Sequence, residues 1–147
     1  MNEQELIALL TGMRKDPIFV CRISQDMAAA IGVADTAVWL SRETVVKQES
    51  KHSEPSKRLY LRAPHIIANG FVRVQPPHHL IFIYHEKMEK LRSFQAVVKA
   101  TQAGHELYLV SIHRVDRTGV RATHRKTTTL EKWKRRRREV GPPKNPT

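Results

Sequence analysis

The sequence predicts an α+β domain in which N-terminal helices pack on a four-stranded antiparallel sheet and a basic tail follows. In the first half of the chain, apolar residues recur at helical spacing. From residue 71 onward the pattern becomes extended, with four apolar segments separated by short turns, as in an antiparallel meander. The 147 residues, 40% of them hydrophobic, suffice for one core. Helices followed by strands are typical of the α+β class.

The first forty residues predict short elements bounded by clear end signals. Asp16-Pro17 ends the first helix, because the residue before a proline disfavours helical backbone. Ser24 is a suitable N-cap for the second helix. The expected elements are a helix over residues 3–13, a strand over 18–23, a helix over 25–30 and an extended segment over 36–40. Residues 1–37 are either part of the main domain or an appended piece, and both alternatives stay open.

The middle of the chain predicts a longer helix over residues 42–52. Ser41 can cap it, and Glu43 in its first turn complements the helix dipole. A second helical or irregular stretch follows over residues 60–69. The four strands expected after it cover residues 71–74, 79–84, 94–99 and 106–112.

Side chains alternate between the two faces of each strand. On the last strand, strict alternation places Ser111 and His113 on the side of Leu107 and Leu109. The same alternation places Tyr108, Val110, Ile112 and Arg114 on the opposite side. A concave face that combines Lys99, His85, Arg114 and Ser111 would hold a phosphate, whereas scattered edge charges are the alternative interpretation.

Charge is the strongest signal for function. The chain carries 26 Lys and Arg against 14 Asp and Glu, a formal net charge of +12 at pH 7. Residues 121–139 alone hold nine of these cations and two acids. Such an excess attracts polyanions, nucleic acid first. We expect residues 1–126 to form a single domain and residues 127–147 to form a basic, partly disordered tail.

The helix over residues 42–52 gathers groups that suit an anionic substrate. Residues four apart share a helix face, so Lys47 lies with Lys51, and Gln48 lies with His52. This face offers ammonium groups for charge and an imidazole for proton transfer. An ordinary solvated face of a surface helix is the alternative interpretation.

The residue types exclude several enzyme classes. His78, His79 and His85 are close in sequence, but the chain has one cysteine, no HExxH motif and no nearby carboxylates at ligand spacing. We therefore expect no metal and no other cofactor. The remaining set of His, Lys, Arg, Ser and Thr suits the cleavage of RNA by its own 2′-hydroxyl. That reaction needs a base, a proton donor and cations for the developing phosphorane.

Five segments resemble the phage-encoded branch of the barnase–EndoU–colicin–RelE-like nuclease superfamily. They are LSRETVVKQESKH, LYLRAPHIIANGF, HLIFIYHEK, FQAVVKAT and ELYLVSIHRV, and together they span about residues 38–116. The resemblance implies a four-stranded antiparallel sheet and a metal-independent RNase activity. Carried over by position, it implicates Lys51 and His52 at the helix end, Lys87 after the second strand, the VVK lysine Lys99, and Ser111 and His113 on the closing strand.

Our first hypothesis is a small RNase toxin of phage or toxin-system origin. His52 acts as general base or acid, with His113 or His85 as its partner and Ser111 nearby. Lys51, Lys99 and Arg114 stabilise the phosphorane. The cations expected to bind flanking phosphates are Lys47, Lys87, Arg121, Arg125, Lys126, Arg135, Arg136, Arg137 and Arg138.

This hypothesis names partners and a compartment. The substrate is RNA, with tRNA among the candidates, and an acidic immunity protein or antitoxin would mask the basic face. The single Cys21 fits a reducing cytoplasm, and no apolar window is long enough to cross a membrane.

Two further interpretations stay open. A non-catalytic RNA- or DNA-binding module would use the same cations and would stack bases on Tyr60, Phe82, Tyr84 or Tyr108. A virion or host-takeover protein would instead use the basic tail to bind DNA or a protein partner.

Overall fold

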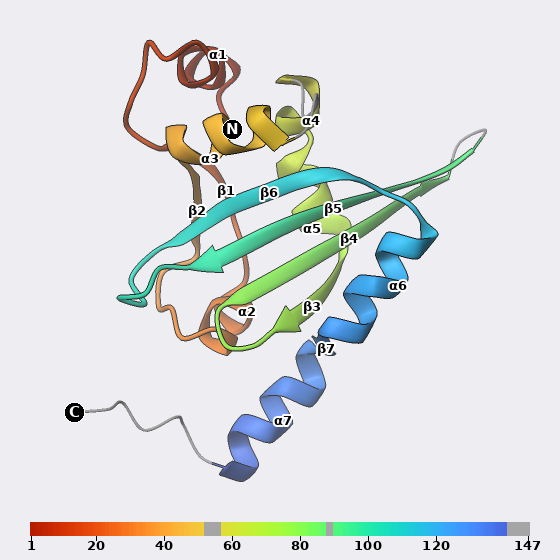
Figure 1. Ribbon diagram of the computed structural model, residues 1–147. Coiled ribbons are helices and arrows are strands. Elements are labelled where there is room, and N and C mark those ends of the chain that lie inside the picture. The colour runs from red at the N-terminus through yellow and green to blue at the C-terminus, as the bar shows by residue number, and fades with distance from the viewer. Residues whose placement is uncertain (52–56, 88–89, 141–147) are drawn as a thin grey trace.

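The computed structural model describes residues 1–51, 57–87 and 90–140 (Figure 1). The elements before residue 70 are α1 (Glu3–Thr11), β1 (Ile18–Arg22), α2 (Gln25–Ala30), β2 (Ala37–Leu40), α3 (Arg42–Lys51), α4 (Lys57–Leu61) and α5 (Ala63–Asn69). Those after it are β3 (Phe71–Gln75), β4 (His79–Lys87), β5 (Leu91–Ala100), β6 (Leu107–Val115), α6 (Arg117–Lys126), β7 (Thr128–Thr129) and α7 (Leu130–Val140). The α+β class is confirmed.

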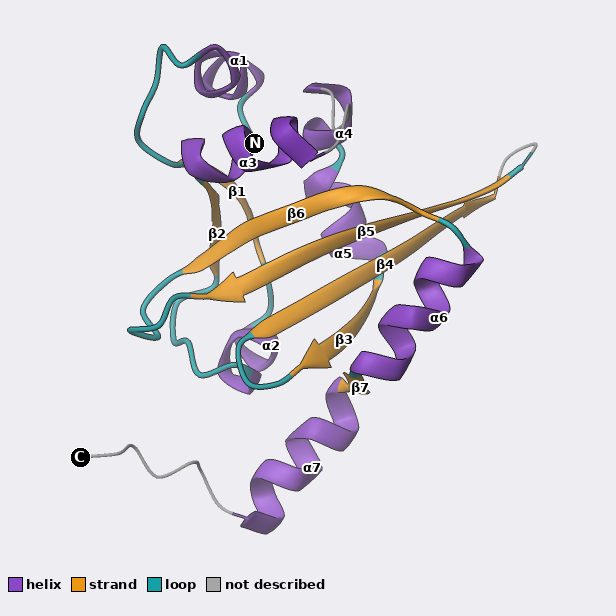
Figure 2. Cartoon of the chain, in the orientation of Figure 1, coloured by secondary structure: helices purple, strands orange, loops and turns teal. Residues whose placement is uncertain are grey.

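The sheet differs from the predicted one, since its described part has seven strands in the order β1-β2-β6-β5-β4-β3-β7. Strands β3 to β6 form the predicted antiparallel meander (Figure 2). The prediction of a four-stranded antiparallel sheet is wrong because the sheet grows at both edges. β2 joins β6 in parallel, through Val38 opposite Leu107 and Trp39 opposite Tyr108, and β1 pairs with β2. The two-residue strand β7 adds to β3.

Side-chain caps set the start of several helices. Ser24 Oγ accepts a hydrogen bond from the Met27 amide, and Ser41 Oγ accepts one from the Thr44 amide, as the sequence predicts. Asp116 caps α6 in the same way through the Gly119 amide at 2.7 Å. This helix is absent from the elements that the sequence predicts, because a segment so rich in Arg and Thr has few apolar residues to mark a helical period.

One hydrophobic core unites the two halves of the chain. Leu6 and Leu9 of α1 and Ile18 of β1 are buried in the same cluster as Phe82 of β4 and Leu109 of β6. Residues 1–37 therefore contribute strand β1 and several core side chains to the domain. In the tail, residues 128–140 form β7 and α7, while residues 141–147, where we expected disorder, lie outside the described part.

A β-bulge in β6 decides which side chains face the core. In β5, Val98 pairs with Leu109 and the preceding residue, Val97, pairs with Ser111. Val110 of β6 therefore has no pairing partner and is an extra residue. Strict alternation is therefore wrong beyond this point. Ile112 turns into the core, and Ser111 and His113 join the face of Tyr108.

None of the helices in the described ranges combines the length and apolar character needed to cross a membrane.

Candidate active site

The face of the sheet opposite the core carries polar side chains that could do chemistry. Directly paired residues of antiparallel strands project to the same face, so strand register places each of them. His79, Lys99 and Tyr108 form one row across β4, β5 and β6. We call this face the outer face, and its polar members on β3 to β6 are Arg73, Gln75, His79, His85, Lys87, Ser93, Gln95, Lys99, Tyr108, Ser111 and His113.

Helix α6 crosses part of the outer face. Thr123 Oγ1 donates a hydrogen bond of 2.7 Å to Gln95 Oε1 of β5, and both residues are buried. Just beyond the helix end, Arg73 Nε of β3 donates to Thr127 Oγ1 at 2.6 Å. The helix thus runs from the end of β6 towards β3. It leaves the rows around Lys99 and Tyr108 on the side that faces α3.

A pocket of about 630 Å³ lies between α3 and that uncovered part of the sheet. Four cations and several hydroxyl groups line it, against one acid, Glu43. Its lining residues are Lys15, Pro17, Ser41, Arg42, Glu43, Thr44, Lys47, Lys99, Ala100, Thr101, Gln102, Tyr108 and Val110. Lys47 from the helix and Lys99 from the VVK strand, which the sequence assigned to one substrate, therefore line the same cavity.

The lining groups differ in how they are engaged. Arg42 Nη1 donates to the carbonyl oxygens of Leu9 and Leu10, both at 2.9 Å, so it joins α3 to α1. Tyr108 Oη donates to Glu106 Oε2 at 2.7 Å. That hydrogen bond, followed by burial and the charges of Glu106 and Glu43, raises the pKa of Tyr108 to about 12. The phenol therefore stays protonated at neutral pH and remains a hydrogen-bond donor.

After Tyr108, the next two residues of β6 that lie on the outer face are Ser111 and His113. Ser111 Oγ and His113 Nδ1 are 3.2 Å apart, at hydrogen-bonding distance. Ser111 pairs with Val97, two residues from Lys99 on β5, so it lies between the lysine and the imidazole along the sheet. The bulge at Val110 brings this pair to the outer face, which alternation alone would not predict, but neither residue lines the pocket.

His79 is a further candidate that the sequence analysis considered only as a metal ligand. It pairs directly with Lys99 and is partly buried. Burial, then the charges of Lys99 and His78, lower its pKa from 6.5. A neutral imidazole at pH 7 can accept a proton. The signal for this role is the register between β4 and β5, which the sequence alone does not fix.

Several predicted site residues lie elsewhere. Arg114 pairs with the buried Phe94, so it projects from the face opposite Ser111 and cannot join a phosphate site there. Lys87 is exposed at the far end of β4. His85 is on the outer face, with its Nδ1 2.7 Å from Ser93 Oγ, but α6 separates this end from the pocket. Lys51 ends α3; its side chain and the whole of His52 lie outside the described residues.

Most of the predicted phosphate-binding cations on α6 and α7 are exposed, and one contacts another helix. Arg121, Arg125 and Lys126 of α6 are exposed, as are Arg135, Arg136 and Arg138 of α7. Arg137 is different, because its Nη1 donates to the Ala29 carbonyl oxygen of α2.

Within the described part of the chain, no three His, Cys, Asp or Glu side chains gather as metal ligands would. Comparisons with protein-family models, curated proteins and solved structures find no match to this chain.

Proposed function

We propose that the protein is a metal-independent endoribonuclease that cleaves RNA through attack of the 2′-hydroxyl on the adjacent phosphate. The observation that carries this proposal is the pocket that Lys47 and Lys99 share. The Ser111–His113 pair lies further along the same face of the sheet, outside the pocket lining. The resemblance of the segments around these residues to the barnase–EndoU–colicin–RelE-like nucleases agrees with it. An RNA phosphate in this pocket would meet three lysines, namely Lys15, Lys47 and Lys99.

The proposed reaction balances with side chains alone. A base takes the proton of the 2′-hydroxyl as its oxygen bonds to phosphorus. An acid then protonates the leaving 5′-oxygen as the phosphorus–oxygen bond breaks, which gives a 2′,3′-cyclic phosphate and a 5′-hydroxyl. Lys47 and Lys99 stabilise the negative charge that develops on the phosphorane.

His113, held by Ser111, is the proton-transfer group that the proposal uses first. The second proton-transfer group is either His79, which lies beside Lys99, or His52, which the sequence assigns to the end of α3. The placement of His52 stays a prediction, because this residue lies outside the described part.

Cleavage in the presence of EDTA tests the proposal. The purified protein should cut RNA to products with 2′,3′-cyclic phosphate ends and should leave 2′-O-methyl RNA of the same sequence intact. His113→Ala should lower kcat/KM by at least about 100-fold, as loss of a general acid or base does. Lys99→Ala should cost a similar factor through lost charge stabilisation. His79→Ala and His52→Ala then identify the second group.

A matched control comes from α4. Arg58 is exposed and lies away from the pocket lining, so Arg58→Ala removes one cation and should keep wild-type kcat/KM. Intact RNA after incubation with the wild-type protein, or full activity of His113→Ala, would reject the proposed mechanism.

A second candidate function, RNA binding without cleavage, is favoured by one aromatic side chain. Phe71 is 71% exposed on β3, and its ring centroid lies 6.3 Å from that of His85. Such a pair could stack on a base. Two of the residues predicted to stack on bases, Tyr60 and Phe82, are buried and cannot reach a ligand. Retarded but uncut RNA on a gel would favour this second function.

The proposed RNase activity keeps the expectation of an inhibitor. An acidic immunity protein or antitoxin would complement the cations of the pocket and would block access to Lys47 and Lys99.

A further inference from the structure

The basic C-terminal segment is a fixed part of the domain. Trp133 Nε1 donates to the Ala30 carbonyl oxygen at 2.6 Å, and Arg137 donates to the neighbouring carbonyl of Ala29. These two side chains bind carbonyl groups at the C-terminal end of α2, where the carbonyl of Ala29 also accepts a hydrogen bond from the Gly32 amide. Leu130 and Trp133 also pack against the hydrophobic core.

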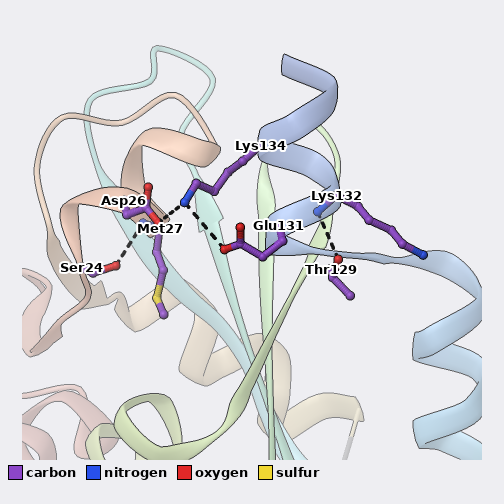
Figure 3. A network of polar contacts seen from close by, with 7 residues as sticks. All are labelled: Ser24, Asp26, Met27, Thr129, Glu131, Lys132 and Lys134. Carbon is purple, nitrogen blue, oxygen red and sulfur yellow. Dashed lines mark hydrogen bonds and ion pairs between the residues drawn. The ribbon is translucent and has the colours of Figure 1, made fainter. Parts of the chain in front are cut away.

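An ion pair adds to this attachment. Lys134 Nζ lies 2.6 Å from Asp26 Oδ2 of α2 and 3.8 Å from Glu131 Oε1 (Figure 3). In the same view the side chain of Lys132 extends away from α2. Helix α7 therefore has one side on the domain and one side in solvent.

The solvent side is strongly basic. Lys132, Arg135, Arg136 and Arg138 are exposed, and none of the acids in the described residues forms an ion pair with them. Cations three or four residues apart on a helix repel one another. The attachment through Trp133 and Arg137 holds them together against that repulsion, which an anionic ligand would relieve.

Helix α6 presents a second exposed series. Arg117, Arg121 and Arg125 are four residues apart, about 6 Å along the helix axis, and all are exposed. The helix is fixed to the sheet by Thr123 and Gln95. The strand β7, paired with β3, connects α6 to α7, so the two helices follow one another along the side of the sheet (Figure 1).

We propose that the exposed cations of α6 and α7 bind the phosphate backbone of RNA outside the cleavage pocket. These cations are Arg117, Arg121, Arg125, Lys132, Arg135, Arg136 and Arg138. Guanidinium groups match phosphate oxygens with two parallel hydrogen bonds, and arginine predominates in this set. The choice of RNA as ligand rests on the proposed function.

The surface fits nucleic acid better than an acidic protein. Stable protein interfaces centre on large apolar or aromatic side chains. The exposed large hydrophobic residues of the described part are Ile7, Met13, Phe19, Val46, Phe71 and Leu91, and none of them is on α6 or α7. A repeating row of charges without an apolar centre is what a phosphate backbone requires.

The test measures the affinity of the full chain for a labelled 2′-O-methyl RNA, which cannot be cleaved, as a function of salt concentration. The test variant combines Arg135→Gln, Arg136→Gln and Arg138→Gln. If all three contact phosphates, the slope of log K against log salt should become shallower by about 2, since each contact contributes roughly 0.7 with single strands. A second triple variant, Arg117→Gln, Arg121→Gln and Arg125→Gln, should act in the same direction.

The control variant removes the same number of positive charges as each test variant, at positions outside α6 and α7. Arg58→Gln, Lys90→Gln and Arg92→Gln alter three exposed cations outside α6 and α7 and should leave the slope within about 0.7 of wild type, less than one contact. Circular dichroism confirms that each variant folds. Equal loss in the test and control variants would overturn the proposal, because affinity would then depend on net charge alone.

Two further arms identify the ligand and separate this inference from the catalytic one. Single-stranded DNA of the same sequence should bind with a similar slope, since phosphates carry the contacts. Polyglutamate should compete poorly; equal competition at matched charge would indicate an acidic protein partner and overturn the choice of RNA. Lys99→Ala should lose cleavage and should change the slope by no more than the roughly 0.7 of one phosphate contact, against about 2 for each triple variant, so failure of the proposed function and failure of this inference give different results.

Discussion

His79 shows how strand register sets the chemistry of a single side chain. Register places its imidazole directly opposite Lys99 on β5, and burial comes before the charges of Lys99 and His78 among the causes that lower its pKa. We expect an NMR titration of the imidazole protons to give a midpoint for His79 below 6.5. Lys99→Gln should raise that midpoint, because it removes a positive charge. An unchanged midpoint in Lys99→Gln would show that burial and His78 set the shift without Lys99.

The same shift links pH to stability. The folded protein binds fewer protons at His79 than the unfolded chain does between the lowered pKa and 6.5. The unfolding free energy therefore rises with pH in that window. The contribution of His79 is complete above pH 6.5 and is lost as pH falls through the folded-state pKa.

Single residues also mark the limit of prediction for the site. The sequence placed Lys47 and Lys99 near a common substrate, and they line one pocket. It placed Ser111 and His113 on the side of Leu109 and Arg114 on the side of Tyr108, and one extra residue in β6 reverses both placements. A bulge depends on the pairing of two strands, so the sequence of one strand does not reveal it.

At the scale of elements, the attachment of α7 to α2 can be tested through Trp133. Trp133→Leu keeps an apolar side chain but removes the hydrogen bond to the Ala30 carbonyl, which leaves a helix-end acceptor without that partner. We expect a loss of about 1 kcal/mol in unfolding free energy. Amide hydrogen exchange should accelerate in α7 and remain slow in β4 and β5.

A matched control for this prediction lies on the solvent side of the same helix. Arg136→Gln changes an exposed residue and should leave exchange in α7 at the wild-type rate. Equally fast exchange in both variants would show that α7 is held by something other than its contacts with α2.

Local sequence patterns predict some helices and strands better than others. The short helix over residues 25–30 and the meander strands follow from caps, turns and apolar alternation, and the structure confirms them. Helix α6 escaped prediction because its attachment to the sheet uses a polar pair, Thr123 with Gln95. A polar contact between distant segments leaves no hydrophobic period in the sequence.

At the scale of the whole molecule, the sheet joins segments that are far apart in the chain. The meander is local, so short-range patterns predicted it. The parallel contact of β2 with β6 brings the N-terminal strands to the edge of the meander, and no local pattern specifies that partner. Sequence patterns alone therefore do not decide whether residues 1–37 are an integral or an appended part.

Truncation decides between these alternatives. Removal of residues 1–37 deletes Leu6, Leu9, Ile18 and Val20, which are each at most 1% exposed. Burial of four such side chains contributes about 6 to 12 kcal/mol, at roughly 1.5 to 3 kcal/mol each. That amount is comparable to the whole stability of a typical domain, about 5 to 15 kcal/mol. The shortened chain should therefore lack a cooperative thermal transition and a dispersed amide NMR spectrum, whereas a cooperatively folded fragment would show that the meander and its helices are stable without α1, β1 and α2.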